Sequence, residues 1–172
     1  MAAFSRHHRS RQQCRTGSAR ADANGFQVNR ATPHMRSIAQ RLINYERPAN
    51  ASTEATDTAI FQVTERLRPH LAMLMGNAGF RALLARALAL AGAEVASLRA
   101  IQVNADGTLE GLKTLQARLT PAAFREVRVV LLAQLLGLLV AFIGPVLTLR
   151  LLGEIWPQLE ADNVDFGNGD KK

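Results

Sequence analysis

The longest uncharged, strongly apolar stretch of the chain runs from Val129 to Leu149. A helix of about 18 or more such residues is long enough to cross the hydrocarbon layer of a bilayer. Thr120-Pro121 marks the start of the helix that enters this run, because Thr caps helices and Pro suits the first helical position. Gly144-Pro145 predicts a helix break, which divides the apolar helix over 122–152 into two pieces.

Helical spacing of apolar residues predicts three further helices before this run. The first spans Met35–Glu46 and ends before Pro48, since the residue before a proline is disfavoured in the helical region. The second starts near Ile60 and stops at Gly76–Gly79, where Gly or Asn can adopt the left-handed cap conformation. The third follows over Phe80–Ser97.

Between the third helix and the apolar helix, the periodicity changes. Apolar and polar residues alternate over Ile101–Val103, and the residue types of Asn104–Gly107 favour a turn. Thr108–Glu110 can then form a second strand that pairs antiparallel with the first. A minor β-hairpin near 100–110 is therefore expected, packed on the helices because an isolated two-stranded ribbon is only marginally stable. Leu and Ala dominate the composition and aromatic residues make up only 5%, which favours helix. We predict an all-α fold, a small bundle of four to five helices.

One folded domain is expected over 35–157, between a basic tail over 1–34 and a flexible polar tail over 158–172. The first 34 residues hold six arginines and one aspartate, so most of the net charge of +7 lies there. Disorder is predicted for this segment, and a transit peptide, or a translation start at Met35 rather than Met1, fits it as well. The tail lacks interleaved aromatic residues, so nucleic acid is not a favoured partner.

Residues that could support catalysis are scattered along the chain. Cys14 is the only cysteine, which excludes an intramolecular disulfide. No phosphate-binding loop, dinucleotide-binding glycine motif, nucleophile elbow or His-Glu-x-x-His pattern occurs, and His70 is the only histidine of the predicted domain. We therefore expect no catalytic, metal-binding or cofactor-binding site, and no enzymatic activity. Four glutamates beside arginines are interpreted as solvated helix faces: Glu46, Glu65, Glu94 and Glu126.

Ala133, Gly137 and Ala141 recur every four residues and therefore lie on one face of the apolar helix. Such a ladder of small residues lets two helix backbones approach closely, in membranes especially, and the same geometry serves the centre of a soluble bundle. Gln134 lies beside the ladder and needs a hydrogen-bonding partner in either setting. These three small residues are the predicted helix-packing face.

Residues 74–91 read LMGNAGFRALLARALALA, and residues 137–152 read GLLVAFIGPVLTLRLL. Both stretches, the second closing on a Trp-Pro pair, resemble segments of small uncharacterised bacterial α-helical proteins. The resemblance covers about residues 35–157 and implies a single domain with no known activity. In those proteins an acidic residue follows the glycine that matches Gly144, where this chain has Pro145. An acid there would be expensive inside a membrane, so the resemblance favours a soluble family.

Two interpretations of the apolar run stay open. In the first, the chain is a non-enzymatic protein held in a membrane by a single-pass helix over 129–149. Arg125, Arg128 and the basic tail then place the N-terminus in the cytoplasm, with Trp156 at the far interface. In the second, 129–149 is the core of a soluble cytoplasmic bundle that acts as an interaction or oligomerisation module, enclosed by the helices of 58–97. Hydropathy gives the membrane a narrow lead, and a membrane or a homo-oligomer is the expected partner.

Overall fold

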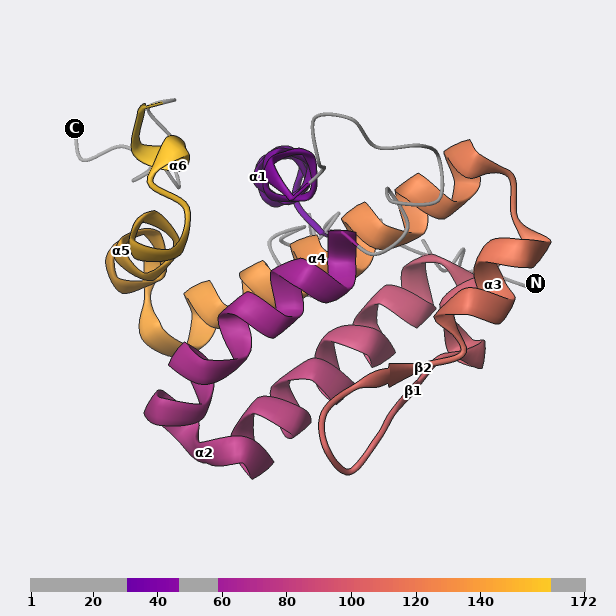
Figure 1. Cartoon of the computed structure of the whole chain (residues 1–172), viewed down its shortest axis with the longest axis horizontal. Coiled ribbons are helices and arrows are strands. Elements are labelled where there is room, and N and C mark those ends of the chain that lie inside the picture. Colours follow the sequence, from indigo (N-terminus) through magenta and orange to yellow (C-terminus); the bar gives the residue numbers. More distant parts are fainter. Residues whose placement is uncertain (1–30, 47–58, 162–172) are drawn as a thin grey trace, which may run out of the picture.

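The structure is a computed structural model that describes residues 31–46 and 59–161. It is an all-α bundle with a minor hairpin, as predicted (Figure 1). The elements in chain order are α1 (Pro33–Tyr45), α2 (Ala59–Glu94), the 3-10 helix η2 (Ala96–Ala100), β1 (Gln102–Val103), β2 (Leu109–Glu110), α3 (Leu112–Arg118), α4 (Pro121–Ile143), α5 (Pro145–Ile155) and α6 (Gln158–Ala161). The tails predicted over 1–34 and 158–172 lie largely outside the described residues.

α2 consists of two helical arms that meet at Gly76 and fold back beside each other (Figure 1). At Gly76 the backbone has φ 73° and ψ 167°, a conformation open essentially to glycine alone. The stop predicted at Gly76–Gly79 is therefore confirmed. The second arm ends at Glu94 and gives way to η2, so the helix predicted to reach Ser97 is three residues shorter.

The expected hairpin is present. β1 and β2 pair antiparallel, with Val103 opposite Leu109. In the turn between them, the carboxylate of Asp106 accepts hydrogen bonds from the backbone N–H of Thr108 at 2.9 Å and from its hydroxyl at 2.7 Å. These hydrogen bonds hold the pKa of Asp106 below its usual value. The turn is thus stabilised by its own side chains.

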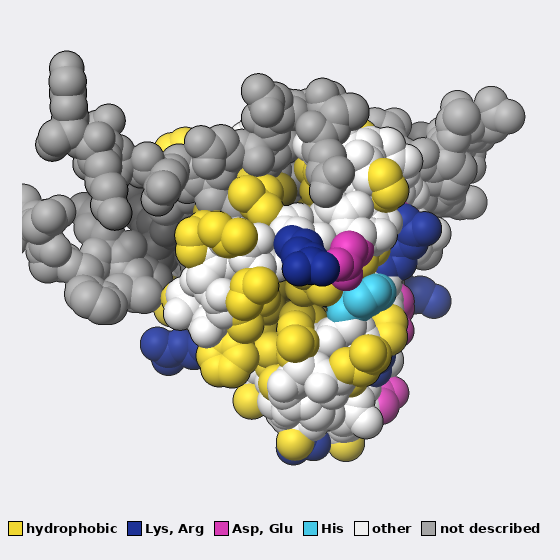
Figure 2. All heavy atoms as spheres, turned by 90° about the vertical axis from the view of Figure 1, so that its left-hand side faces the viewer, with side chains coloured by type: hydrophobic (Ala, Val, Ile, Leu, Met, Phe, Trp, Pro, Cys, Tyr) yellow, Lys and Arg dark blue, Asp and Glu magenta, His cyan; other side chains and the backbone are white. Residues whose placement is uncertain are grey.

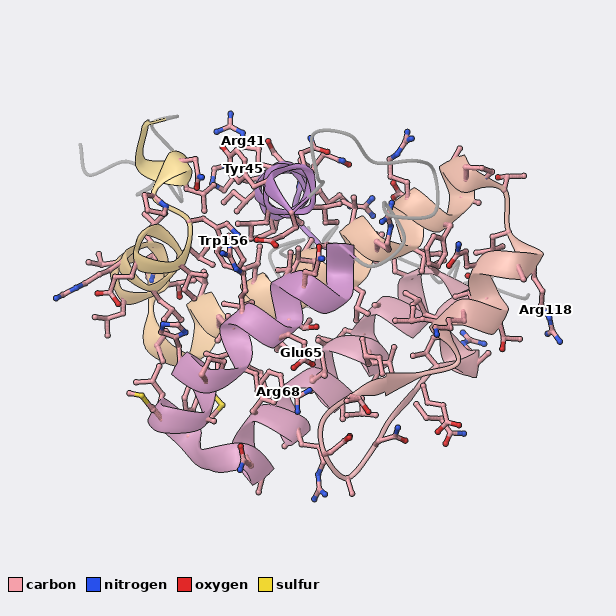
Figure 3. The ribbon with its side chains drawn as sticks, viewed as in Figure 1. Arg41, Tyr45, Glu65, Arg68, Arg118 and Trp156 are labelled. Carbon is pink, nitrogen blue, oxygen red and sulfur yellow. The ribbon has the colours of Figure 1, made fainter. Side chains whose placement is uncertain are left out.

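Arg68, on the first arm of α2, connects this hairpin to the bundle (Figure 3). Its guanidinium donates to the backbone carbonyl of Asp106 and to the carboxylate of Glu65, and it lies 5.3 Å from the centroid of the Phe80 ring. Gly107, at the tip of the turn, has φ 81°, and a Cβ there would come within 3.2 Å of the same ring. The hairpin therefore packs on α2, as its marginal intrinsic stability requires.

The apolar run divides into α4 and α5 at Gly144, the position where the sequence predicts the break. Thr120 caps α4, its hydroxyl accepting a hydrogen bond from the backbone N–H of Ala123 at 3.3 Å. Gly144 then takes φ 84° and ψ 162°, again a conformation nearly exclusive to glycine, and Pro145 starts α5. The run from Val129 to Leu149 is therefore two helices joined at a sharp corner.

Both ends of the folded domain extend beyond the predicted range of 35–157. At the start, the Thr32 hydroxyl accepts a hydrogen bond from the backbone N–H of Met35 at 3.2 Å, and Pro33 occupies the first turn of α1. At the end, α6 follows Pro157, and its Leu159 is only 2% exposed. The prediction placed both boundaries at the limits of apolar periodicity and so omitted a cap and a short final turn.

Thr32→Ala is expected to lower the free energy of unfolding by about 0.5–2 kcal/mol, because it removes the side-chain acceptor from the first turn of α1. Urea unfolding followed by circular dichroism measures this loss. Ser37→Ala, at an exposed position of the same helix, is the matched control and should cause no comparable loss. Equal stabilities of the two variants would show that Thr32 does not cap α1.

Candidate interaction surface

The middle of α4 is the core of the bundle. All ten residues from Val127 to Leu136 are buried, and α1 and α2 pack against them (Figure 1). Within the described ranges, α4 is also the one helix long and apolar enough to cross a membrane by length and composition. Most of its most apolar part is buried inside the protein. The first half of the apolar run is thus enclosed by other helices of the same chain.

Gln134 finds its partner inside the bundle. Its side-chain amide donates a hydrogen bond to the carboxylate of Glu94 on α2 at 3.2 Å. The Glu94 side chain is only 10% exposed, and it also accepts from the backbone N–H of Ala31 at 3.1 Å and from the guanidinium of Arg36. The prediction that Glu94 lies on a solvated helix face is therefore wrong. Its carboxylate joins the start of α1 to α2 and α4.

Arg36 connects α1 to both neighbouring helices. Its guanidinium pairs with Glu94 on α2 and with Glu126 on α4. Burial would lower the pKa of Arg36, but hydrogen bonds and charge from these two carboxylates outweigh that effect and raise the pKa above its usual value. The Glu126 side chain is 54% exposed, so its ion pair is well solvated and contributes little. The pair with Glu94 is the more shielded of the two.

A second partly buried carboxylate joins the two ends of the domain. Glu46, directly after α1 and 11% exposed, accepts a hydrogen bond from the indole N–H of Trp156 at 2.6 Å and another from Arg66 at 2.7 Å. The Arg66 guanidinium also lies 5.9 Å from the indole centroid. Trp156 is 1% exposed and lies between α5 and α1 (Figure 3). The predictions of a solvated Glu46 and an interfacial Trp156 are both wrong, because the two side chains are hydrogen-bonded to each other and largely shielded from solvent.

The three residues of the predicted helix-packing face have different surroundings. Ala133 is fully buried, Gly137 is half-buried and Ala141 is exposed. A Cβ built on Gly137 would meet no atom within 4 Å beyond its own turn of helix, so no other described segment approaches it closely. The close backbone contact suggested by the ladder is therefore not made at Gly137 within the described part of the chain.

Large apolar side chains are exposed where α2 bends and where α4 meets α5. Figure 2 shows the molecule from the left-hand side of Figure 1, and hydrophobic side chains gather on this face. The glycine-dependent bends at Gly76 and Gly144 bring these helix ends to the surface here. We call this surface the apolar end, and define it by five side chains that are 55–84% exposed: Met73, Leu74, Phe142, Val146 and Leu147.

A groove of about 160 Å³ lies on the apolar end, between α2 and α5. Arg150 and Glu154 stand at its edge, with the Arg150 Nε 3.3 Å from a carboxylate oxygen of Glu154. Their side chains are 76% and 55% exposed, so this pair adds only a few tenths of a kcal/mol, roughly, to stability. The groove thus has apolar walls and one charge of each sign at its rim. Its apolar lining consists of Leu74, Ile143, Leu147 and Leu151.

A larger groove of about 520 Å³ separates the second arm of α2 from η2 and β1. Small side chains such as Ala85, Ala89 and Ala93 form one wall. The charged residue of its lining is Arg99, whose Nε–H donates to the backbone carbonyl of Gly92 at 3.0 Å. That guanidinium therefore helps to hold η2 against α2.

The described part of the chain contains no group of three or more His, Cys, Asp or Glu residues that could hold a metal ion. His70 is half-exposed, and its Nδ1 lies 3.2 Å from the carbonyl of Arg66 one turn earlier. The two partly buried carboxylates, Glu46 and Glu94, are each paired with an arginine, and these pairs join helices to one another.

No protein-family model, curated protein or solved structure matches the chain. The resemblance of residues 74–91 and 137–152 to bacterial helical proteins therefore stays a prediction. Two structural features bear on the function of this protein, the enclosed middle of α4 and the apolar end.

Proposed function

We propose that the chain is a non-enzymatic helical bundle that acts as a protein-interaction module, with the first half of its apolar run as the core. One observation carries the proposal. The run divides into a part enclosed by α1 and α2 and a part, around Phe142 to Leu147, whose large apolar side chains are exposed. Enclosure accounts for the hydrophobicity of α4, and the exposed remainder offers a surface for a partner.

A single-pass membrane helix, with its N-terminus in the cytoplasm, is the second candidate. The length and composition of α4 favour it. To be surrounded by lipid, however, α4 would have to leave α1 and α2, which separates Gln134 from Glu94. Arg128, now 3% exposed inside the bundle, would lie at the cytoplasmic end of that span, where a cation is tolerated. The loss of the Gln134–Glu94 hydrogen bond is therefore the penalty that the bundle avoids.

Fractionation of cells that produce the full chain separates these two candidates. We expect the protein in the soluble fraction, and any sedimented protein to be released by alkaline carbonate. Gln134→Leu is the informative variant, because it makes α4 more apolar and removes one of the donors to Glu94. A spanning helix would be retained more firmly with this substitution. Retention of the wild-type chain after carbonate treatment, strengthened in Gln134→Leu, would contradict the proposed function.

A further inference from the structure

We infer that the partner of the apolar end is a second copy of this chain, which makes the module a homodimer. This inference rests on the proposed function, because the surface has to be free in a soluble bundle. All five side chains of the apolar end are more than half exposed, so they form an uncovered apolar patch on the order of a few hundred Å². The largest apolar patch on a typical monomer is about 300–600 Å² and often functional.

The charges at the rim favour a second copy over a lipid surface. A bilayer with anionic headgroups attracts clusters of cations, whereas Arg150 here stands beside Glu154. A surface that binds its own copy has to be self-complementary, so each cation needs an anion on the other copy. A rim with one arginine and one glutamate meets that requirement. A rim whose charges all had the same sign would repel the same rim on the second copy.

The apolar end is small, so the dimer interface is expected at the small end of specific interfaces, about 1,200 Å² in total. Its affinity depends on packing and desolvation rather than on the buried area. Phe142 and Val146 directly precede Ile143 and Leu147, which line the groove. A two-fold arrangement lets each copy place exposed side chains against the groove of the other.

Analytical ultracentrifugation of the full chain, from about 1 to 100 μM, tests this inference. We expect a monomer–dimer equilibrium for the wild type and at least a tenfold higher dissociation constant for Val146→Asp. Val146 lies in the first turn of α5, where an aspartate is compatible with the helix dipole, so this variant should stay folded. Thr114→Asp, at an exposed position of α3 outside the apolar end, is the matched control and should dimerise like the wild type.

A charge exchange tests the self-complementary rim directly. Arg150→Glu makes the rim acidic and Glu154→Arg makes it basic, so each variant alone should dimerise at least about tenfold more weakly than the wild type. An equimolar mixture of the two should recover dimers, since each acidic rim then meets a basic one. Circular dichroism of the separate variants checks that both are folded.

The outcomes separate the dimer from the proposed function on which it rests. A soluble wild-type chain that stays monomeric at 100 μM, or a Val146→Asp variant that dimerises like the wild type, would overturn the dimer at the apolar end. Binding of the monomer to vesicles of anionic phospholipid would assign the surface to a membrane instead. Failure of the Arg150→Glu and Glu154→Arg mixture to recover dimers would overturn the rim pairing. A chain that remains in membranes after carbonate treatment would contradict the proposed function itself.

Discussion

Trp156→Ala is expected to lower the free energy of unfolding by about 3–5 kcal/mol, the range for removing a large buried aromatic side chain. The indole is 1% exposed and fills the space between α5 and α1. Its N–H also donates to Glu46, so the substitution leaves a cavity and removes one of the two donors to a partly buried carboxylate. Urea unfolding followed by circular dichroism measures the loss.

Trp156→Phe separates packing from hydrogen bonding at this position. The phenyl ring retains most of the apolar contacts but cannot donate to Glu46, which still has Arg66 as a partner. We expect a loss of about 1–3 kcal/mol, clearly smaller than that of the alanine variant. An alanine variant as stable as the wild type would mean that Trp156 is not a core residue.

Glu94→Ala is expected to destabilise the bundle by about 2–4 kcal/mol, somewhat less than a fully buried pair because the Arg36 side chain is 30% exposed. The substitution leaves Gln134 without its hydrogen-bond acceptor in the core and removes the carboxylate that is paired with Arg36. The free energy of unfolding in urea is again the measurement. Ala31 loses the acceptor of its backbone N–H as well, so the start of α1 should fray.

Two controls test whether this effect comes from the carboxylate of Glu94. Glu94→Gln preserves an acceptor oxygen without the charge and should have an intermediate stability. Glu126→Ala removes the solvated partner of Arg36 and should change the free energy of unfolding by less than about 1 kcal/mol. A Glu94→Ala variant no less stable than Glu126→Ala would contradict the central role of Glu94.

Much of the fold could be predicted because local patterns determine it. The spacing of apolar residues, three and four positions apart, is sufficient to predict α1, both arms of α2 and α4. The break at Gly144 and the stop at Gly76 follow from backbone chemistry, since both residues take positive φ. α3 was not predicted, because its seven residues, Leu112–Arg118, are too few to display a helical period.

The buried polar contacts could not be predicted. Glu94 and Gln134 are forty residues apart, and only the rotation of α2 relative to α4 decides that they meet. The same holds for Glu46 and Trp156, whose separation is 110 residues. An isolated glutamate next to an arginine has the same local pattern on a solvated face and in a bundle. The division of the apolar run into a buried and an exposed part likewise depends on where α1 and α2 end.

The packing of α1 on α4 has a consequence for the synthesis of the chain. About a hundred residues separate the end of α1 from the end of α4, which a ribosome adds in roughly 5–20 s. During that time the apolar face of α1, including Ile38 and Leu42, has no α4 to cover it. The nascent chain thus presents the apolar faces of the outer helices before the core helix that covers them has been made.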